Sequence, residues 1–136
     1  MLIRKIEMKD LDEVYKLLNE LYENKIGYNV FIEKYKNSLD GNDFYGIVAE
    51  ENNKIFGTLI ARIVNRLVKS QNTLFVDEKN RQMGIGKMLL QNAIDYAKKK
   101  SCETLELTSY IPNESAHKFY ENNGLIKHSY KFKKKL

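Results

Sequence analysis

The chain has 136 residues, of which 43% are apolar and 30% charged. This length predicts one domain over residues 1–136, since most domains have about 100–150 residues. The single cysteine, Cys102, excludes an internal disulfide framework and favours a reducing compartment. No uncharged stretch is longer than seven residues, whereas a membrane helix needs about 20. We therefore expect a cytoplasmic protein without a membrane partner.

The net charge of +5 is concentrated at the C-terminus, because four lysines lie among the last six residues: Lys131, Lys133, Lys134 and Lys135. Without these four, 19 basic residues face 18 acidic ones, so the rest of the chain is close to neutral. A solvated tail explains such a run better than a nucleic-acid surface does. We expect no nucleic-acid partner, and a small nucleic-acid binder remains the least favoured alternative.

The N-terminal part of the sequence predicts a strand followed by two helices. Residues Leu2–Ile6 form the strand. The first helix should begin at Asp10, whose carboxylate can cap free N–H groups while Glu13 reaches back. A second helix is predicted over Val30–Leu39, with a turn at residues 40–43. The first helix has one apolar stripe at helical spacing: Leu11, Val14, Leu17, Leu18 and Leu21.

The remaining sequence predicts five strands and two helices, with turns at residues 51–53 and 65–69. They are the strands Phe44–Ala49, Lys54–Ile63 and Gln71–Val76, the helix Gly86–Lys100, the strand Thr104–Leu107, the helix Asn113–Asn123 and a closing strand Ile126–Phe132. The order β-α-α-β-β-β-α-β-α-β predicts an α/β (α+β) fold with a mixed sheet and helices on its faces.

The segment from Leu74 to Lys87 runs from a strand, through a turn with Gly84 and Gly86, into a helix. The first N–H groups of a helix lack internal partners and lie at the positive end of its dipole. Glycines let the backbone wrap an anion, and Arg81 and Lys87 add positive charge. The pattern predicts a phosphate-binding loop, although two glycines before a helix can also form only a tight turn.

Two common phosphate-binding motifs are excluded. A nucleoside-triphosphate loop needs a glycine five residues before Gly86-Lys87 and a Ser or Thr after it, but Arg81 and Met88 occupy these places. A dinucleotide-binding loop needs a third glycine where this chain has Leu89.

The last predicted helix carries a second set of candidate residues. Asn113, Ala116 and Tyr120 share one face, at positions i, i+3 and i+7. An amide, a small residue and a phenol in one stripe suit an elongated ligand that contains amide groups. Phe119 points elsewhere and is expected in the core.

Together these segments resemble the GNAT superfamily of N-acetyltransferases over nearly the whole chain. Arg81-x-x-Gly84-x-Gly86 resembles its pyrophosphate loop, and Asn113-x-x-Ala116-x-x-Phe119-Tyr120-x-x-x-Gly124 resembles its final conserved helix. The resemblance implies a GNAT-like, mainly antiparallel central sheet flanked by helices. It also implies acetyl-CoA as cosubstrate and, as in similar proteins, a possible homodimer.

The resemblance further implies roles for individual residues. Tyr120 would lie near the thioester sulfur, and many relatives carry a glutamate base where this chain has Asn72. The implied cofactor-binding residues are Phe75 and Val76 for the pantetheine arm, Arg81, Gln82, Met83, Gly84, Ile85, Gly86 and Lys87 for the pyrophosphate, and Asn113 with Ala116 on the final helix.

The chemistry of acyl transfer favours Tyr120 as a hydrogen-bond donor to the leaving sulfur, because a phenol of pKa about 10 is protonated at neutral pH. Ordinary core packing is the alternative for this tyrosine. Neither Gln71 nor Thr73 can replace the missing glutamate, so the base is an ordered water or, less favoured, Glu106. His117, His128 and Cys102 show no metal-ligand spacing, and no metal is expected.

We therefore interpret the chain as an N-acetyltransferase that moves an acetyl group from acetyl-CoA to a primary amine of a small molecule or peptide. A non-catalytic acyl-CoA-binding module is the alternative. The acceptor would lie between the first two helices, the strands around residues 44–62 and the loop at Tyr110. Four tyrosines are candidates for its walls: Tyr22, Tyr28, Tyr35 and Tyr110.

Overall fold

The computed structural model describes residues 1–21, 26–71 and 74–136. Its helices are α1 (Leu11–Leu21), α2 (Tyr28–Lys36), α3 (Ile85–Lys99) and α4 (Glu114–Asn122). Its strands are β1 (Leu2–Lys5), β2 (Phe44–Glu51), β3 (Lys54–Val64), β4 (Leu67–Gln71), β5 (Leu74–Val76) and β6 (Thr104–Thr108). Single 3-10 turns precede α1 (Met8–Asp10) and α3 (Glu78–Asn80).

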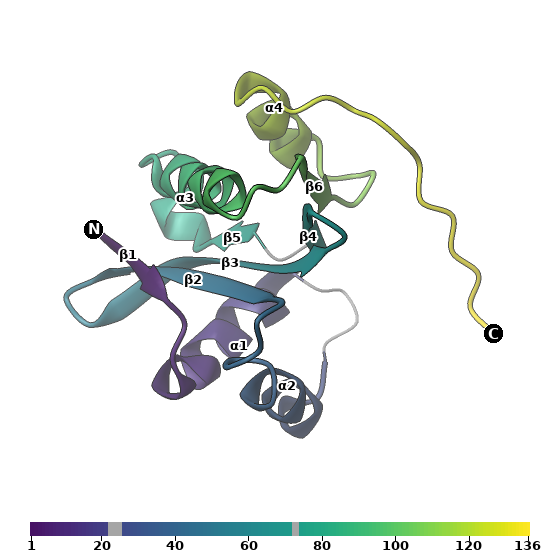
Figure 1. Cartoon of the computed structure of the whole chain (residues 1–136). Helices are drawn as coiled ribbons and strands as arrows, with labels where there is room; N and C mark the ends of the chain where they lie inside the picture. Colours follow the sequence, from purple (N-terminus) through teal and green to yellow (C-terminus); the bar gives the residue numbers. More distant parts are fainter. Residues whose placement is uncertain (22–25, 72–73) are drawn as a thin grey trace.

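One mixed sheet separates two pairs of helices. Its order is β1-β2-β3-β4-β6, and β5 pairs with β3 outside this path. All strand pairs are antiparallel except β4–β6, which is parallel. Figure 1 shows α1 and α2 on one face of the sheet and α3 and α4 on the other. This arrangement confirms the mixed, mainly antiparallel fold that the sequence predicted.

The alternation of side chains along the strands produces an apolar core on each face. On the first face, α1 and α2 pack with Val48, Ile60 and Phe75 from the sheet. On the second face, α3 packs with Leu59, Val68 and other sheet residues. Consecutive residues of β5 therefore face opposite cores: Phe75 faces α1, whereas Leu74 and Val76 pack with the α3 cluster.

The strand β3 is long enough to pair with two different strands along one edge. Its residues Arg62–Val64 pair with β4, and Gly57–Leu59 pair with β5. Only β4 continues to β6. Within the described part of the chain, the other edge of β5 therefore has no hydrogen-bonded strand, and we call it the free edge of β5.

Two predicted strands differ from the structure. Of the predicted strand 71–76, Gln71 ends β4 and Leu74–Val76 form β5, whereas residues 72 and 73 lie outside the described residues. The expected turn at residues 65–69 is shorter, because within it only Asn65 and Arg66 have positive φ and Leu67 already belongs to β4. The closing strand Ile126–Phe132 is not formed, and no described strand pairs with it. Residues 126–136 are exposed and follow α4 as an extended tail (Figure 1).

The predicted cap of the first helix is also wrong. The Asp10 carboxylate accepts hydrogen bonds from the Arg4 guanidinium at 2.6 and 2.9 Å and from the Glu7 N–H at 2.8 Å. Glu13 accepts from the N–H of Ile55 instead of reaching back to the helix start. Both carboxylates connect α1 and its preceding turn to the sheet, a long-range role that spacing along the sequence does not reveal.

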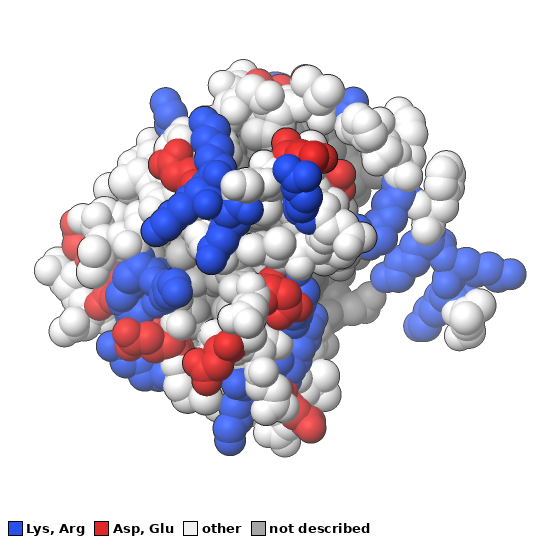
Figure 2. Space-filling view, viewed as in Figure 1, with Lys and Arg blue, Asp and Glu red and all other residues white. Residues whose placement is uncertain are grey.

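The surface charges follow the division between body and tail. In Figure 2 basic and acidic side chains are interspersed over the visible face of the body, while the tail carries lysines alone. No helix within residues 1–21, 26–71 and 74–136 has the length and apolar character to cross a bilayer.

The ion pair of Asp10 predicts a strong effect on stability. Asp10 is 4% exposed, and although burial by itself would raise its pKa, the hydrogen bonds from Arg4 and Glu7 outweigh burial and hold the pKa below its usual value. Asp10→Asn should lower the free energy of unfolding by about 1–3 kcal/mol at neutral pH, because Arg4 loses one of its two carboxylate partners and keeps only Glu50. Urea denaturation measures the loss.

A lowered pKa stabilises the fold above the unfolded-state pKa and stops doing so as pH falls through the folded-state value. The difference between wild type and Asp10→Asn should therefore shrink between neutral pH and about pH 3. Asp43→Asn, in an exposed pair with Arg62 at 3.1 Å, is the control and should cost less than about 1 kcal/mol. Equal losses in both variants would contradict the role of Asp10.

Candidate active site

The loop between β5 and α3 leads the backbone into the helix with its first amides free. Gln82 and Gly84 have positive φ angles of 66° and 80°. The first hydrogen bond within α3 runs from the N–H of Met88 to the carbonyl of Gly84. The N–H groups of Ile85, Gly86 and Lys87 therefore have no carbonyl partner within the helix. They lie at the positive end of the dipole of this 15-residue helix.

The space beside this helix start is open. A Cβ added at Gly84 would meet no atom within 4 Å, and Gln82, Met83 and Lys87 are exposed. The geometry suits a bound anion, because unpaired amides and the helix dipole point to a solvent-accessible place. The structure thus brings together the loop residues that the sequence singled out.

Arg81 lies at the junction between this loop and β5. Its Nε donates a hydrogen bond to the Val76 carbonyl at 3.2 Å, and its guanidinium lies 5.4 Å from the centre of the Phe75 ring. The side chain is exposed, so it is held at the end of β5 without being buried there.

The hydrogen-bond register of β5 decides which backbone groups face the free edge. Asp77 N–H donates to the Phe56 carbonyl at 2.8 Å, and hydrogen-bonded pairs alternate along an antiparallel ladder. Phe75 therefore exchanges its hydrogen bonds with Thr58, its register partner. The N–H and C=O groups of Leu74 and Val76 point away from β3, to the free edge.

Helix α4 begins and ends as the sequence predicted. The side chain of Asn113 caps it by accepting from the N–H of Ala116 at 3.3 Å, and Gly124 follows the helix with φ of 86°. Because the Oδ1 atom of Asn113 serves as the cap, its Nδ2 group is the part that can donate to a ligand.

A close contact holds α4 against the start of α3. A Cβ added at Gly86 would lie 3.2 Å from the Phe119 ring and 3.7 Å from a methyl group of Val76. Helix α4, helix α3 and strand β5 therefore meet at one place, and the glycine allows this approach. Phe119 lies where these elements meet but is only half-buried and is a member of neither apolar core, in contrast to the expectation from the sequence.

Tyr120 follows Phe119 and is half-buried. Its hydroxyl has no hydrogen-bond partner among the residues that the structure describes. Burial raises the pKa of Tyr120 to about 12. The phenol is therefore protonated throughout the physiological pH range and keeps its O–H as a donor.

Thr108 was not singled out by the sequence analysis. It is the last residue of β6, and its buried Oγ1 is without a hydrogen-bond partner in the described ranges. Buried hydroxyls are normally paired, so this atom is a candidate ligand contact. No sequence pattern marks it, because its isolation depends on where β4 and β6 place it.

The tyrosines expected at the acceptor site have different surroundings. Tyr28 is exposed and donates to Asp12, while Tyr35 is buried against the Phe31 ring, so Tyr35 belongs to the core. Tyr110 is exposed in the loop before α4. Tyr22, like Asn72 and Thr73, lies outside the described residues; Glu106 is exposed on β6, in register with Lys69.

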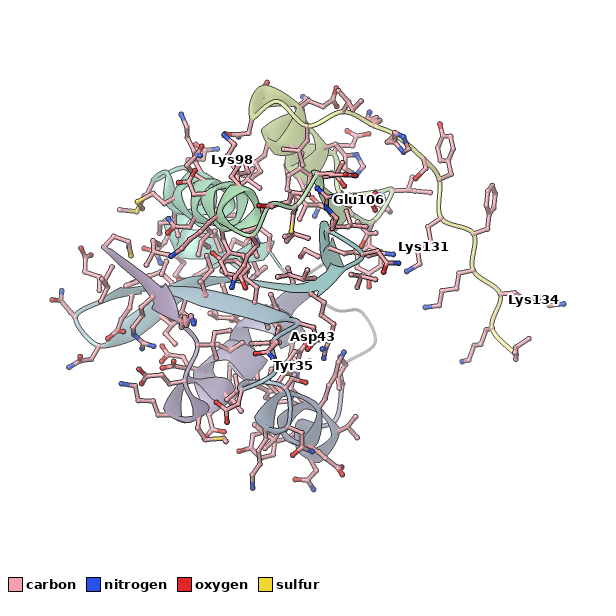
Figure 3. The ribbon with its side chains drawn as sticks, viewed as in Figure 1. Tyr35, Asp43, Lys98, Glu106, Lys131 and Lys134 are labelled. Atoms are coloured by element: carbon pink, nitrogen blue, oxygen red, sulfur yellow. The ribbon has the colours of Figure 1, made fainter. Side chains whose placement is uncertain are left out.

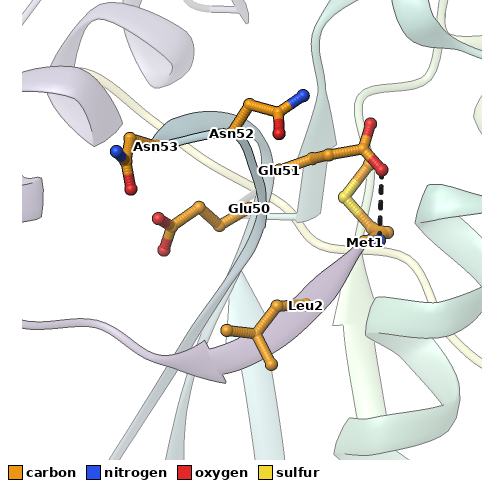
Figure 4. A pocket seen from close by; sticks show the side chains of 6 residues that line it. All are labelled: Met1, Leu2, Glu50, Glu51, Asn52 and Asn53. Carbon is orange, nitrogen blue, oxygen red and sulfur yellow. Dashed lines mark hydrogen bonds and ion pairs between the residues drawn. The ribbon is translucent and has the colours of Figure 1, made fainter.

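Two surface cavities lie elsewhere, and neither is lined by a candidate residue of the loop before α3 or of α4. One, of about 360 Å³, is lined by Met1, Leu2 and the β2–β3 turn, and its two carboxylates, Glu50 and Glu51, make it unsuitable for an anion (Figure 4). The other, of about 330 Å³, lies between the β2 start and the C-terminal part of α3, with Tyr96 and Lys100 in its wall. Within the described ranges, no group of three or more His, Cys, Asp or Glu residues could hold a metal ion.

Comparison with known proteins explains this combination of fold and loop. The sequence matches the acetyltransferase (GNAT) family over residues 11–125. It is 29% identical to an aminoalkylphosphonate N-acetyltransferase of Salmonella typhimurium, over 98% of this chain and 90% of that protein. It is 30% identical to an uncharacterized N-acetyltransferase of Methanocaldococcus jannaschii, over 90% of this chain and 59% of that protein.

Solved structures share the fold at lower identity. A transcriptional regulator from Bacillus halodurans superposes with a TM-score of 0.86 at 21% identity, covering 99% of each chain. An aminoglycoside N-acetyltransferase in complex with CoA superposes with a TM-score of 0.85 at 18% identity, covering 98% of this chain and 93% of that one.

The chain belongs to the GNAT family of acetyltransferases. It is an acyltransferase of the class that uses acetyl-CoA to acetylate nitrogen.

The unpaired hydroxyl of Thr108 predicts that its removal will not destabilise the protein. Thr108→Val removes a buried polar group that makes no hydrogen bond, so the free energy of unfolding should stay constant or rise by about 1 kcal/mol. Thr58→Val is the matched control, since the buried Thr58 hydroxyl donates to the Ile47 carbonyl at 2.9 Å. That change should cost about 1 kcal/mol. Urea denaturation compares them, and an equal loss at Thr108 would show that its hydroxyl has a protein partner.

Proposed function

We propose that residues 1–136 act as one N-acetyltransferase domain that transfers the acetyl group of acetyl-CoA to a primary amine. The observation that supports this most directly is the meeting of three elements at Gly86: the open start of α3, the free edge of β5 and the helix that carries Tyr120. Each offers hydrogen bonds to a different part of one elongated ligand.

In this proposal the pyrophosphate of acetyl-CoA binds at the start of α3. The N–H groups from Gln82 to Lys87 surround it, and no side chain fills the space beside Gly84. Arg81 and Lys87 add positive charge at the two ends of the loop.

The pantetheine arm then extends along the free edge of β5, as an added strand would. The outward N–H and C=O groups of Val76 serve this role, as the sequence suggested. The second pair of groups comes from Leu74, two residues earlier, because Phe75 turns its own backbone to Thr58. A ligand that binds the Val76 carbonyl oxygen would displace the Arg81 side chain, because Arg81 Nε donates a hydrogen bond to this oxygen. Asn113 donates from Nδ2, and the small Ala116 leaves room for the arm.

Tyr120 acts by donating a hydrogen bond to the sulfur as the C–N bond forms and the C–S bond breaks. Complete proton transfer from a phenol of pKa about 12 to a thiolate whose thiol has a pKa of about 8.5 costs roughly 5 kcal/mol. A hydrogen bond that strengthens in the transition state avoids this cost. One of the two outward N–H groups, that of Leu74 or that of Val76, would polarise the thioester carbonyl while the other binds the arm.

The incoming amine must lose a proton, and an ordered water is the base in this proposal. Glu106 is the alternative, because it is exposed on β6, the strand next to β4. Its register partner on β4 is Lys69. The hydroxyl of Thr108 at the end of the same strand would be free to contact the acceptor.

The acceptor is a small molecule or peptide with a primary amine. Names of similar proteins support a small molecule: one acetylates aminoalkylphosphonates and another aminoglycosides. We also propose that the protein works in the cytoplasm as a homodimer, with no nucleic acid or membrane as partner.

Calorimetry with CoA and a thiol-release assay test the proposal together. We expect CoA to bind and acetyl-CoA to release thiol only when an amine acceptor is added. The panel should contrast anionic aminoalkylphosphonates with cationic aminoglycosides and polyamines, and include amino acids and peptides. Binding without turnover on any amine would favour an acyl-CoA-binding module, and absence of CoA binding would contradict both.

Tyr120→Phe tests the role of the phenol. It should lower kcat by about 10–100-fold, because the donor to the sulfur is lost, and leave the affinity for CoA unchanged. For the wild-type protein, kcat should not fall from ionisation of Tyr120 below about pH 11, since its pKa is raised to about 12.

Tyr130→Phe is the control, because Tyr130 is 86% exposed in the C-terminal tail, outside the proposed site, and loses the same single oxygen. An unchanged kcat in Tyr120→Phe with every active acceptor would remove this residue from the mechanism.

A further inference from the structure

The face of the sheet that carries α1 and α2 is covered unevenly. The apolar core between the sheet and these helices takes its strand residues from β2, β3 and β5, and from neither β4 nor β6 among the described residues. On the other face, Val68 of β4 and Leu105 of β6 belong to the α3 cluster. Successive side chains of a strand point to opposite faces. Lys69, Glu106 and Thr108 therefore point to the side without an apolar cover, which we call the open face of β4 and β6.

The strand register places three charged residues in one row on this side of the sheet. Arg62 lies two residues after Ile60, a member of the core below α1 and α2, so both share a face. Arg62 pairs with Asp43 at 3.1 Å, on the side of α2. Arg62 is in register with Lys69, and Lys69 with Glu106. The row therefore runs from β3 across β4 to β6.

The charges of Lys69 and Glu106 are available to a ligand. Neither residue makes an ion pair within residues 1–21, 26–71 and 74–136, although the two are in register. Lys69 is half-buried, and its other neighbour in the row is the cationic Arg62. Like charges side by side on neighbouring strands are unfavourable. An anionic group bound at Lys69 would offset this repulsion.

The row lies near the place to which the proposed function brings the acetyl group. With the pyrophosphate at the start of α3, the pantetheine arm runs along β5 toward Leu74, the first residue of that strand. Strand β4 ends shortly before it at Gln71, which is in register with Thr108 at the end of β6. The thioester would thus reach the ends of β4 and β6. Lys69 and Glu106 lie two residues before these ends, about 7 Å along the strands.

We propose that Lys69 selects acceptors that carry an acidic group, a carboxylate or a phosphonate, in addition to the primary amine. Its ammonium group binds the acidic group, and the carboxylate of Glu106 beside it favours the positively charged amine as it enters. An acceptor with positive charges alone leaves Lys69 without a partner and is repelled by it. The inference rests on the proposed function, because it assigns the acceptor to the same site.

Paired acceptors test the role of Lys69 in the thiol-release assay. β-Alanine and 2-aminoethylphosphonate carry an acidic group, whereas β-alaninamide keeps the primary amine and lacks the acid. In the wild-type protein kcat/KM should be at least about tenfold higher for the better acid than for the amide, because a charge-assisted hydrogen bond is gained. The better of the two acids shows whether a carboxylate or a phosphonate is bound.

Substitutions of Lys69 should change this preference through KM and not through kcat. Lys69→Met removes the charge but keeps the apolar stem, so the preference for the acid should fall by about tenfold. Lys69→Arg keeps the charge and should keep the preference. Lys98→Met is the matched control, because Lys98 is exposed on α3; Figure 3 shows it on the opposite side of the sheet from Asp43. An unchanged preference in Lys69→Met, or a wild-type protein that favours the amide, would overturn the inference.

Calorimetry with the same three compounds separates this inference from the proposed function. Turnover only of amines without an acidic group would overturn the inference and leave the proposed function intact. Turnover of no amine would contradict the proposed function, and binding would then decide the inference. Binding of either acid that Lys69→Met weakens by about tenfold supports it. Binding of neither acid, or equal binding to the wild-type protein and Lys69→Met, would overturn it.

Discussion

The structure depends on one constraint in the sheet: β3 pairs along the same edge with two strands, and only one of them continues to β6. Between residues 57 and 64 the edge of β3 passes from β5 to β4. Because β6 follows β4, the backbone groups of Leu74 and Val76 have no strand to satisfy them. Buried or half-buried backbone groups require hydrogen-bond partners, so this edge can exchange hydrogen bonds with the amide groups of a ligand.

The same constraint directs the chain into α3. Strand β5 ends at Val76, and the loop after it turns at Gln82 and Gly84 to start a helix beside that strand. The free amides of the helix and the free edge of β5 are therefore continuous. The half-buried Phe119 lies against Gly86 where α4 meets α3 and β5, and Tyr120 is the next residue in the chain. Binding groups and the phenol are positioned by packing rather than by hydrogen bonds between them.

Much of this could be predicted from the sequence, because the relevant signals are local. Helical periodicity, the glycines at 84 and 86 and the cap at Asn113 each depend on residues a few positions apart. Other features could not be predicted from the sequence, because they depend on contacts with residues far away in the chain. Asp10 has the spacing of a helix cap but pairs with Arg4 in the sheet. The separate pairing of Gln71 in β4 and of Leu74–Val76 in β5 depends on the strands beside them. No pattern in the sequence marks the Thr108 hydroxyl, which is unpaired among the described residues.

The sequence by itself indicated the family, most of the order of elements, and the loop and helix that we propose to bind the cosubstrate, since these follow from residue types at fixed local spacing. It also determined that residues 126–132 alternate as a strand does. Only the tertiary structure decided that Leu74 and Val76, and not Phe75, face the free edge, because the register with β3 sets the direction of each peptide group. It also showed that residues 126–132 form no strand, although β6 ends the sheet with an edge that no described strand occupies.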